Sequence, residues 1–295
     1  MNVLILGAGY IGTAIYEHLH VHSDCTVEML SKSEVRYTDK CVLNFLLSTA
    51  RDKYDVVINC SGYTGRPNVD ACEDNIDDTW YYNVVVPGEI ARVCRENDVH
   101  LIHVSSGCIY DGYEKEFAET DEPNFGIKQK HSSWYSKSKH AGELAVASSG
   151  ASILRIRMPF CATSSNRNVL TKLLAYDYII NQSNSMTNVE DFVCFVSKFL
   201  ERPNIWGEIY NVVNPQPVPT STIINTLKHH GLENPKWQYI SLQELFDMFT
   251  TARRSNCVLS TEKLHKLDLE LPTTIKSLDR CATIIKNELD KSSIQ

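Results

Sequence analysis

The distribution of apolar residues along the first 213 positions predicts a series of short buried strands. Most of these runs are continuously apolar rather than alternating, and polar loops and segments with helical spacing separate them. Continuous apolar strands are typical of a parallel sheet that helices cover on both faces. The predicted strands are 3–6, 26–30, 55–60, 101–104, 152–157 and 208–213.

This strand–helix alternation predicts an α/β fold, a Rossmann-type doubly wound parallel sheet. The rhythm breaks after residue 160, and the remainder predicts a smaller, mostly helical C-terminal lobe. We expect the sheet domain to comprise 1–160 and 187–213, and a discontinuous lobe to comprise 161–186 and 214–295. Helices are expected at 80–97, 189–200, 223–230, 242–249 and 274–289, with a polar loop at 113–133.

A glycine pattern directly after the first strand predicts a dinucleotide-binding turn. The order is strand, G-x-G-x-x-G, helix: the first glycine makes a tight turn, the second admits a pyrophosphate, and the third lets the helix pack on the strand. The alternative is a purely structural turn. The predicted cofactor contacts here are Gly7, Gly9, Tyr10, Ile11 and Gly12.

The second strand ends in hydroxyl and basic residues, which favours NADP over NAD. An NAD site usually has a carboxylate at this strand end for the ribose 2′-hydroxyl. Here Glu28 lies inside the strand, whereas Ser31 and Lys32 follow it and suit a 2′-phosphate. The alternative is that Lys32 is a solvated loop lysine. The end of the third strand adds Cys60, Ser61 and Gly62 to the predicted cofactor site.

A polar loop follows the third strand and predicts contacts with a ligand. Ligands of open α/β sheets bind at the carboxyl ends of the strands. Thr64, Arg66 and Asn68 lie in this loop, with Arg66 suited to a phosphate or sugar. Asp70 and Glu73 have the spacing of a capping pair that opens the next helix.

Two stretches carry the candidate chemistry. The strand at 101–104 runs out into Ser106 and Cys108, which then face the ligand site. Tyr135 and Lys139 are four residues apart and share one helical face. An ammonium beside a phenol favours the phenolate, which makes the tyrosine a better acid. For Cys108 the alternative is a small buried apolar residue.

Three further cationic segments have less certain roles. Arg155 and Arg157 alternate with apolar residues, which suits a sheet edge or pairing with acidic groups. Lys172 lies in a predicted loop and helix at 166–184. The basic turn at 251–256, with Arg254, suits a diphosphate, and a solvated charge pair is its alternative.

Composition excludes several functional classes. The formal charge of −7 argues against nucleic acid or an anionic membrane as the main partner. Ten cysteines without a C-x-x-C pair predict neither a zinc site nor a redox dithiol, and His18, His20 and His22 lack a nearby carboxylate or thiol, so no metal is expected. With no signal peptide and no membrane-length apolar run, we expect a cytoplasmic protein.

The glycine turn, Ser106 and Tyr135-x-x-x-Lys139 resemble the extended short-chain dehydrogenase/reductases, although that family more often has G-x-x-G-x-x-G. Within it, the sequence most resembles the nucleotide-rhamnose synthase/epimerase-reductases, which are relatives of dTDP-4-dehydrorhamnose reductase. The segments that carry this resemblance are Thr64–Asp70 with Cys72-Glu73, Gly107-Cys108-Ile109, Tyr135-Ser136-Lys137-x-Lys139, Arg155-x-Arg157-Met158-Pro159, Thr171-Lys172, Asn184-Ser185-Met186-Thr187, Arg254-Ser255-Asn256 and Thr261-x-Lys263-Leu264.

The resemblance implies a role for each matching residue. Tyr135 would protonate the C4 oxygen during hydride transfer, Lys139 would tune Tyr135 and bind the nicotinamide ribose, and Ser106 would hydrogen-bond the carbonyl. Cys108 and Lys172 would be the acid/base pair of a 3,5-epimerase. The residues expected to bind substrate are Thr64, Arg66, Asn68, Cys108, Asn168 and Arg254.

The resemblance also implies cofactor and partners. NADPH is the expected cofactor, with NADH as the alternative. The expected substrate is UDP-4-keto-6-deoxyglucose, supplied by a 4,6-dehydratase and converted to UDP-L-rhamnose, and a homodimer is left open. One alternative is a reductase only, acting on a dTDP- or UDP-4-keto-L-rhamnose. Another is a non-catalytic regulatory subunit, since the beta subunit of methionine adenosyltransferase resembles these reductases too.

Overall fold

A six-stranded parallel sheet forms the centre of the larger domain. The structure, a computed structural model, describes residues 1–49 and 54–292. The strand order is β10-β6-β4-β3-β1-β2, so the order reverses between β1 and β3. All the predicted strands are present, with ends that differ by a few residues. Their bounds are β1 Asn2–Leu6, β2 Thr26–Leu30, β3 Val56–Asn59, β4 His100–Ser106, β6 Ser152–Ile156 and β10 Ile209–Asn211.

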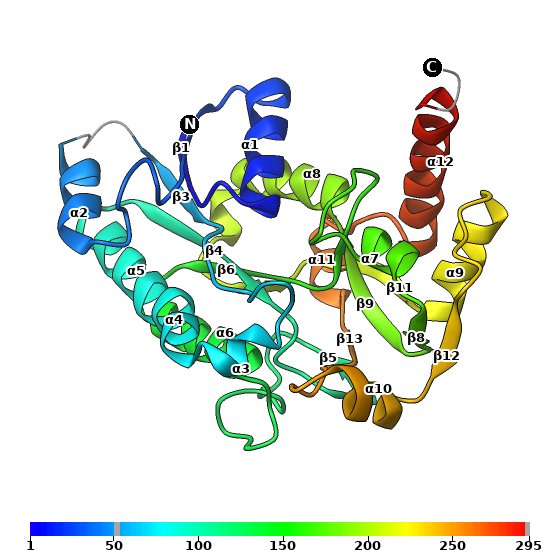
Figure 1. Ribbon diagram of the computed structural model, residues 1–295. Coiled ribbons are helices and arrows are strands. Elements are labelled where there is room, and N and C mark those ends of the chain that lie inside the picture. The colour runs from blue at the N-terminus through cyan, green and yellow to red at the C-terminus, as the bar shows by residue number, and fades with distance from the viewer. Residues whose placement is uncertain (50–53, 293–295) are drawn as a thin grey trace.

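Helices cover both faces of this sheet, which explains why its strands are apolar throughout (Figure 1). Successive strand residues point to opposite faces: Val3 and Ile5 pack in one core with α1 and α8, whereas Leu4 and Leu6 pack in the other with α2, α5 and α6. These helices are α1 Tyr10–His22, α8 Val189–Leu200, α2 Lys40–Ser48, α5 Val86–Glu96 and α6 Trp134–Ala147.

A second lobe lies beside the carboxyl edge of the large sheet and has its own hydrophobic core. Two small sheets contribute to it, β11-β9-β7 and β12-β8. The helices α9 and α12 pack against the first of these sheets. The bounds are β7 Pro159–Phe160, α7 Val169–Ala175, β8 Tyr178–Ile180, β9 Ser183–Asn188, β11 Asn214–Pro219, α9 Thr220–His229, β12 Gln238–Ile240, α10 Leu242–Phe249 and α12 Thr274–Ser292.

Short elements connect the two parts, and several of them depart from the predicted pattern. The loop expected at 113–133 contains a strand, β5, that pairs with β13 from far along the chain. The helix expected at 80–97 is interrupted by a π-helical turn, η1. The bounds are α3 Ala71–Asp74, α4 Ile76–Trp80, η1 Tyr81–Val85, β5 Gly112–Phe117, the 3₁₀ turn η2 Pro203–Ile205, β13 Cys257–Leu259 and α11 Glu262–Lys266.

The division into domains also differs in one segment from the predicted boundaries. Leu264, Leu269 and Leu271 pack in the core of the large sheet rather than in the lobe, because α11 lies against β10. The stretch around α11 therefore packs with the sheet domain, whereas the sequence places all of 214–295 in the lobe. Residues 293–295 of that range lie outside the described residues. Within the described chain, no helix has the length and apolarity to cross a membrane.

Candidate active site

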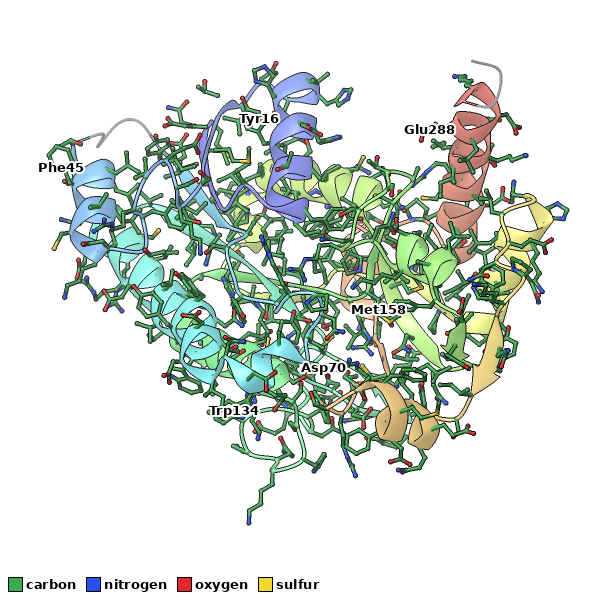
Figure 2. The ribbon with its side chains drawn as sticks, viewed as in Figure 1. Tyr16, Phe45, Asp70, Trp134, Met158 and Glu288 are labelled. Carbon is green, nitrogen blue, oxygen red and sulfur yellow. The ribbon has the colours of Figure 1, made fainter. Side chains whose placement is uncertain are left out.

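A large cavity opens at the carboxyl edge of the sheet, between the sheet domain and the lobe. Its volume is about 1720 Å³, and its lining extends from the start of α1, past the end of β4, to α7 and α10. Asp70 and Met158 lie in this central region of the molecule, whereas Phe45 and Glu288 lie at its outer ends (Figure 2). The cavity lies beside the point where the strand order reverses, which is where open α/β sheets bind ligands.

The glycine turn forms one end of the cavity, and its glycines have distinct roles. A Cβ on Gly12 would lie 2.0 Å from the Gly7 carbonyl oxygen, so only glycine lets α1 approach the strand this closely. Gly7 has φ +106°, a conformation that L side chains rarely adopt. Gly9 lines the cavity, and a Cβ there would meet open space. The space above Gly9, at the N-terminus of α1, therefore fits a pyrophosphate.

The end of β4 and the start of α6 bring three of the predicted catalytic side chains into the cavity. Ser106, Tyr135 and Lys139 all line it. The Ser106 hydroxyl lies near enough to the Tyr135 phenol to lower its pKa. Lys139 is buried, and its ammonium donates to the Val104 carbonyl oxygen at 3.3 Å. The sequence prediction that Tyr135 and Lys139 share one helical face agrees with their places on α6.

The electrostatics of this trio differ from the sequence expectation. Burial, followed by the nearby Cys108 thiol, raises the pKa of Tyr135 above its ordinary value, and the Ser106 hydroxyl opposes this only in part. Burial also lowers the pKa of Lys139 from 10.5 to about 8. Tyr135 is therefore held in its protonated form, the form that donates a proton, and desolvation is the dominant influence on its pKa.

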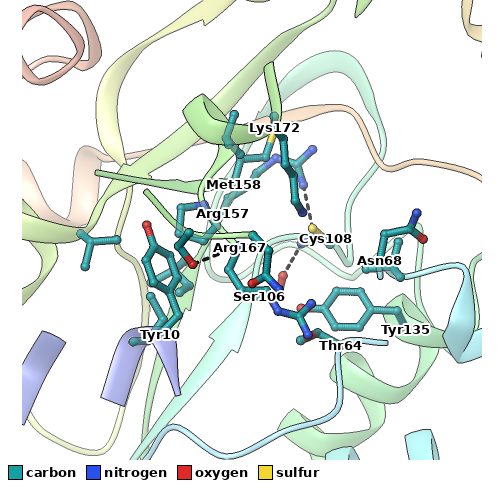
Figure 3. A pocket seen from close by; sticks show the side chains of 18 of the residues that line it. Tyr10, Thr64, Asn68, Ser106, Cys108, Tyr135, Arg157, Met158, Arg167 and Lys172 are labelled. Carbon is teal, nitrogen blue, oxygen red and sulfur yellow. Dashed lines mark hydrogen bonds between the residues drawn. The ribbon is translucent and has the colours of Figure 1, made fainter. Parts of the chain in front are cut away.

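Cys108 and Lys172 face the same cavity from two different segments of the chain. Cys108 follows β4, and its backbone N–H donates to the Ser106 hydroxyl at 3.2 Å. Lys172 reaches from α7 toward Cys108 (Figure 3). Burial, with help from the charges of Arg167 and Arg254, lowers the pKa of Lys172. A thiol and an ammonium therefore line one cavity together with Ser106 and Tyr135.

The loop after β3 lines the cavity as predicted, but its acidic residues have other partners. Thr64, Arg66 and Asn68 are all in the lining. Asp70 makes no helix cap: its carboxylate accepts from both terminal nitrogens of Arg254, at 2.6 and 2.8 Å. Glu73 instead accepts from the backbone of the α6 N-terminus. The predicted capping pair is therefore wrong, because long-range partners outcompete the local backbone.

Arg254 belongs to the lining, although its charge is already paired with Asp70. Of the two arginines of the basic turn, Arg253 is exposed, as the solvated alternative requires, whereas Arg254 is half-buried in the pair with Asp70. The edge position considered for Arg155 is wrong: β6 lies between β4 and β10, and Arg155 forms a buried ion pair with Glu143 at 2.7 Å. The pairing alternative is the correct one for Arg155.

Five predicted site residues do not line the cavity. Gly7 and Gly12 lie behind the lining, where they allow the tight turn and the close approach of α1. Ser31 and Lys32 lie beyond it, where Ser31 donates to Glu34 and Lys32 stacks on the Tyr82 ring at 4.4 Å. Asn168 is buried; its amide donates to the carbonyls of Cys161 and Thr163 and its oxygen caps α7. A direct contact of Asn168 with substrate is therefore contradicted by its geometry. The remaining predicted site residues in the lining are Tyr10, Ile11, Cys60, Ser61 and Gly62.

Sequence reasoning missed several cationic and polar groups of the lining. Arg167 donates to the Gly65 carbonyl at 2.8 Å, which ties the lobe to the loop after β3. Arg157 reaches Cys108, whereas its pattern in sequence indicated only a shared face with Arg155. Outside the lining, Glu34 is a carboxylate four residues after β2, and it accepts from the backbone and the hydroxyl of Ser31. The sequence prediction did not include Glu34, because it considered only the residues directly after the strand and Glu34 comes several residues later. No metal-binding cluster of His, Cys, Asp or Glu occurs among the residues described.

Comparison with known proteins now identifies the family. The RmlD substrate binding domain matches residues 1–195, about two thirds of the chain. This chain belongs to the RmlD family. The bifunctional dTDP-4-dehydrorhamnose 3,5-epimerase/dTDP-4-dehydrorhamnose reductase of Arabidopsis thaliana is 33% identical over 231 residues, 75% of this chain and 74% of that protein.

Other relatives extend this comparison. The trifunctional UDP-glucose 4,6-dehydratase/UDP-4-keto-6-deoxy-D-glucose 3,5-epimerase/UDP-4-keto-L-rhamnose-reductase RHM3 of Arabidopsis thaliana is 36% identical over 219 residues, and this chain spans 32% of its length. The L780 UDP-rhamnose synthase from Acanthamoeba polyphaga mimivirus superimposes with a TM-score of 0.85 and 26% identity, over 97% of this chain and 99% of that one. The predicted family and fold are thus confirmed, and the relatives support an oxidoreductase.

Proposed function

We propose that this RmlD-family protein is an NADPH-dependent 4-keto reductase of a nucleotide sugar that also epimerises its substrate at C3 and C5. Its substrate would be UDP-4-keto-6-deoxy-D-glucose and its product UDP-L-rhamnose. One observation carries the proposal. A reductase trio, Ser106, Tyr135 and Lys139, and an acid/base pair, Cys108 and Lys172, line one cavity that begins at the glycine turn.

The cofactor end of this cavity supports a dinucleotide. The turn around Gly9 leaves open space at the N-terminus of α1, where backbone N–H groups favour a pyrophosphate. A bound nicotinamide cofactor supplies a hydride. The dTDP-4-dehydrorhamnose reductase of Bacillus anthracis, a fold relative with a TM-score of 0.79, was solved in complex with NADP. We propose NADPH here; the Glu34 carboxylate near the end of β2 is the reason to compare it with NADH.

The acid/base pair would act first. A ketone at C4 acidifies the protons on C3 and C5, because the electron pair of the broken C–H bond is delocalised onto the ketone oxygen. Inversion needs one group that removes a proton and another that returns a proton to the opposite face. Cys108 and Lys172 both line the space beside Ser106, and Lys172 reaches toward Cys108 (Figure 3), which supports this pair as the two groups.

The trio would then complete the reduction in place. The Ser106 hydroxyl holds the ketone oxygen, and Tyr135 gives it a proton as the hydride reaches C4. Because burial keeps Tyr135 protonated, the proton is available at neutral pH. Lys139, on the same helix, holds the nicotinamide ribose and later restores the proton of Tyr135. The intermediate need not leave between the two steps.

Cationic groups from the loop after β3 and from later segments of the chain would meet the diphosphate. Arg66, Arg167 and Arg254 line this part of the cavity, together with Thr64 and Asn68. The relatives named above differ in nucleotide, UDP or dTDP. A 4,6-dehydratase activity must supply the 4-keto sugar, because neither epimerisation nor reduction at C4 creates that ketone. The two-domain division, a homodimer and a cytoplasmic location stay predictions from the sequence.

The decisive experiment uses Cys108→Ala, with Cys194→Ala, an exposed thiol on α8, as matched control. Wild type and C194A should oxidise NADPH when given UDP-4-keto-6-deoxyglucose and form UDP-L-rhamnose. C108A should lose this activity about 100-fold or more, while it still reduces supplied UDP-4-keto-L-rhamnose at close to the wild-type rate. Sugar stereochemistry by NMR identifies the product.

Other outcomes favour the other candidates. If C108A forms rhamnose normally from the unepimerised ketone, Cys108 is not the epimerase residue. If wild type reduces only the epimerised ketone, the protein is a reductase alone. If it oxidises NADPH with neither ketone, in the UDP or the dTDP form, it is a non-catalytic nucleotide-binding subunit.

A further inference from the structure

Arg157 is a buried guanidinium that lies directly against the Cys108 sulfur. It follows the last residue of β6 and is only 1% exposed. One terminal nitrogen donates to Cys108 Sγ at 3.4 Å and to the Ser255 hydroxyl at 2.9 Å. The other donates to Asn184 Oδ1 at 2.5 Å and to the Ser255 carbonyl at 2.7 Å. The side chain is therefore fixed by segments from three parts of the chain.

The charge of Arg157 has no counter-ion. All its acceptors are neutral, its Nε has no hydrogen-bond partner, and within the described residues no carboxylate forms an ion pair with it. The carboxylate of Asp111 acts on it only weakly from a distance. A buried charge is costly unless it is paired. Arg155, two residues earlier and equally buried, shows the ordinary solution, a bidentate contact with Glu143.

A thiolate at Cys108 would supply the missing negative charge. The other groups whose charges act together with Cys108 are Tyr135 and Lys139 of α6 and Cys257 of β13. Other cations that face the sulfur are Lys139, whose ammonium donates to the Val104 carbonyl instead, and Lys172, which reaches toward it from α7 without donating a hydrogen bond to it. Arg157 is the group that donates a hydrogen bond to the sulfur itself. Charge-assisted hydrogen bonds of this kind are stronger when the acceptor is an anion.

We propose that Arg157 is a positioning residue for the proton-transfer half of the reaction: it holds the Cys108 sulfur and serves as its counter-ion when the sulfur is a thiolate. This rests on the proposed function. It also assigns a role to each member of the Cys108–Lys172 pair, with Cys108 as the base and Lys172 as the acid. The Cys108 thiolate takes the proton from the carbon next to the ketone, which forms S–H and sends the electron pair to the ketone oxygen. The Lys172 ammonium then gives a proton to the opposite face of that carbon, and exchange with solvent restores both groups.

The first test measures the thiol directly and needs no substrate. Wild type, Arg157→Met, Arg157→Lys and the surface control Arg92→Met are alkylated with iodoacetamide from pH 6 to 10, and the Cys108 peptide is quantified by mass spectrometry, since the chain has ten cysteines. A cation in contact with the sulfur favours the reactive anionic form. We expect R157M to be alkylated at Cys108 about tenfold more slowly than wild type at neutral pH, R157K to be slowed less, and R92M to react like wild type.

The second test separates the two half-reactions. Deuterium exchange from solvent into UDP-4-keto-6-deoxyglucose, without NADPH, should fall about tenfold or more in R157M and less in R157K. Reduction of supplied UDP-4-keto-L-rhamnose should stay within about threefold of wild type in both, because Ser106, Tyr135 and Lys139 are untouched. A purely structural role for Arg157 would instead lower both rates together.

The outcomes distinguish this proposal from the proposed function. An unchanged alkylation profile in R157M and R157K overturns the role of Arg157. If R157M fails to fold, as judged by thermal unfolding, the profile of folded R157K decides in the same way. If wild type shows no deuterium exchange, the epimerase function fails, and a shifted alkylation profile still supports the pairing of Arg157 with Cys108.

Discussion

At the scale of single residues, the site contains a lysine that lowers the stability of the fold. Lys139 is 7% exposed and donates to one carbonyl. Burial lowers its pKa from 10.5 to about 8, so the folded chain disfavours the ammonium form. A residue with this cost is typical of functional sites, where groups are held in unfavourable environments for chemical reasons. Its position four residues after Tyr135 was readable from sequence, whereas its desolvation depends on the packing of β4 and α6.

Replacing Lys139 should therefore separate activity from stability. Lys139→Met should lower NADPH oxidation about 100-fold or more, and at pH 7 it should raise the free energy of unfolding, with an upper limit of about 3 kcal/mol from the lowered pKa. The penalty in wild type is complete below pH 8, where both folded and unfolded chains are protonated. It disappears as pH rises from 8 to 10.5, so the advantage of K139M should shrink in that window.

Denaturant unfolding of wild type and K139M at pH 7, 9 and 10.5 checks this expectation. Lys128→Met is the control, because Lys128 is an exposed lysine paired with Glu122 at the surface. A K139M protein that is less stable than wild type at pH 7 would contradict it, and would show that the packing and hydrogen bond of Lys139 outweigh the cost of its charge.

At the scale of elements, sequence periodicity predicted the helices whose ends are set by local spacing and capping. The helices at 189–200 and 242–249 have the predicted bounds, since each has clear helical spacing and an N-cap, Asn188 or Ser241. The strand β5 could not be predicted, because its partner β13 comes from residues 257–259. The π-helical turn η1 surrounds Asn83, whose amide contacts Tyr63 and Ser138. These contacts form only once the loop and α6 are in place.

The turn before α1 gives a matched pair of glycine variants. A Cβ on Gly12 would collide with the Gly7 carbonyl oxygen, whereas a Cβ on Gly9 would meet open space. Gly12→Ala should therefore lower the melting temperature by several degrees, since displacing α1 costs about 1–3 kcal/mol. Gly9→Ala should melt like wild type but bind NADPH about tenfold or more weakly, because its methyl group occupies the space expected for the pyrophosphate.

Thermal unfolding and fluorescence titration with NADPH measure the two effects. Gly150→Ala is a useful contrast: it too has open space around a Cβ, but its φ of +76° strains an alanine far from the cavity. Unchanged NADPH affinity in G9A would contradict the placement of the cofactor at this turn.

At the scale of the whole molecule, the cavity depends on contacts that no local pattern contains. Asp70 of the sheet domain and Arg254 are 184 residues apart, and the backbone N–H of Ala252 also donates to Asp70. Arg167 of the lobe bonds to Gly65 in the same loop. Most of the site residues that the sequence predicted one by one, at strand ends and in loops, do line the cavity. The sequence could not show that Asp70 and Arg254 neutralise each other, or that Arg157 and Cys108 meet.

The Asp70–Arg254 ion pair should hold the segment 251–256 in place over the cavity. Burial raises the pKa of Asp70, but the hydrogen bonds from Arg254 and the backbone outweigh it and lower the pKa overall. The stabilising contribution is thus present above pH 3.8 and is lost as pH falls through the lowered value. Asp70→Asn should cost about 1 kcal/mol at pH 7, because the pair is partly exposed, and this difference from wild type should shrink as pH falls below 3.8.

The same variant should weaken substrate binding without affecting the cofactor. With Arg254 released, the segment 251–256 loses its anchor to the loop after β3, so KM for the nucleotide sugar should rise several-fold while NADPH affinity stays unchanged. Glu262→Gln, which breaks the exposed pair with Lys266, is the control and should change neither quantity. A wild-type KM in D70N would show that Arg254 is held by the rest of its segment, and that the ion pair only adds stability between the two parts of the chain.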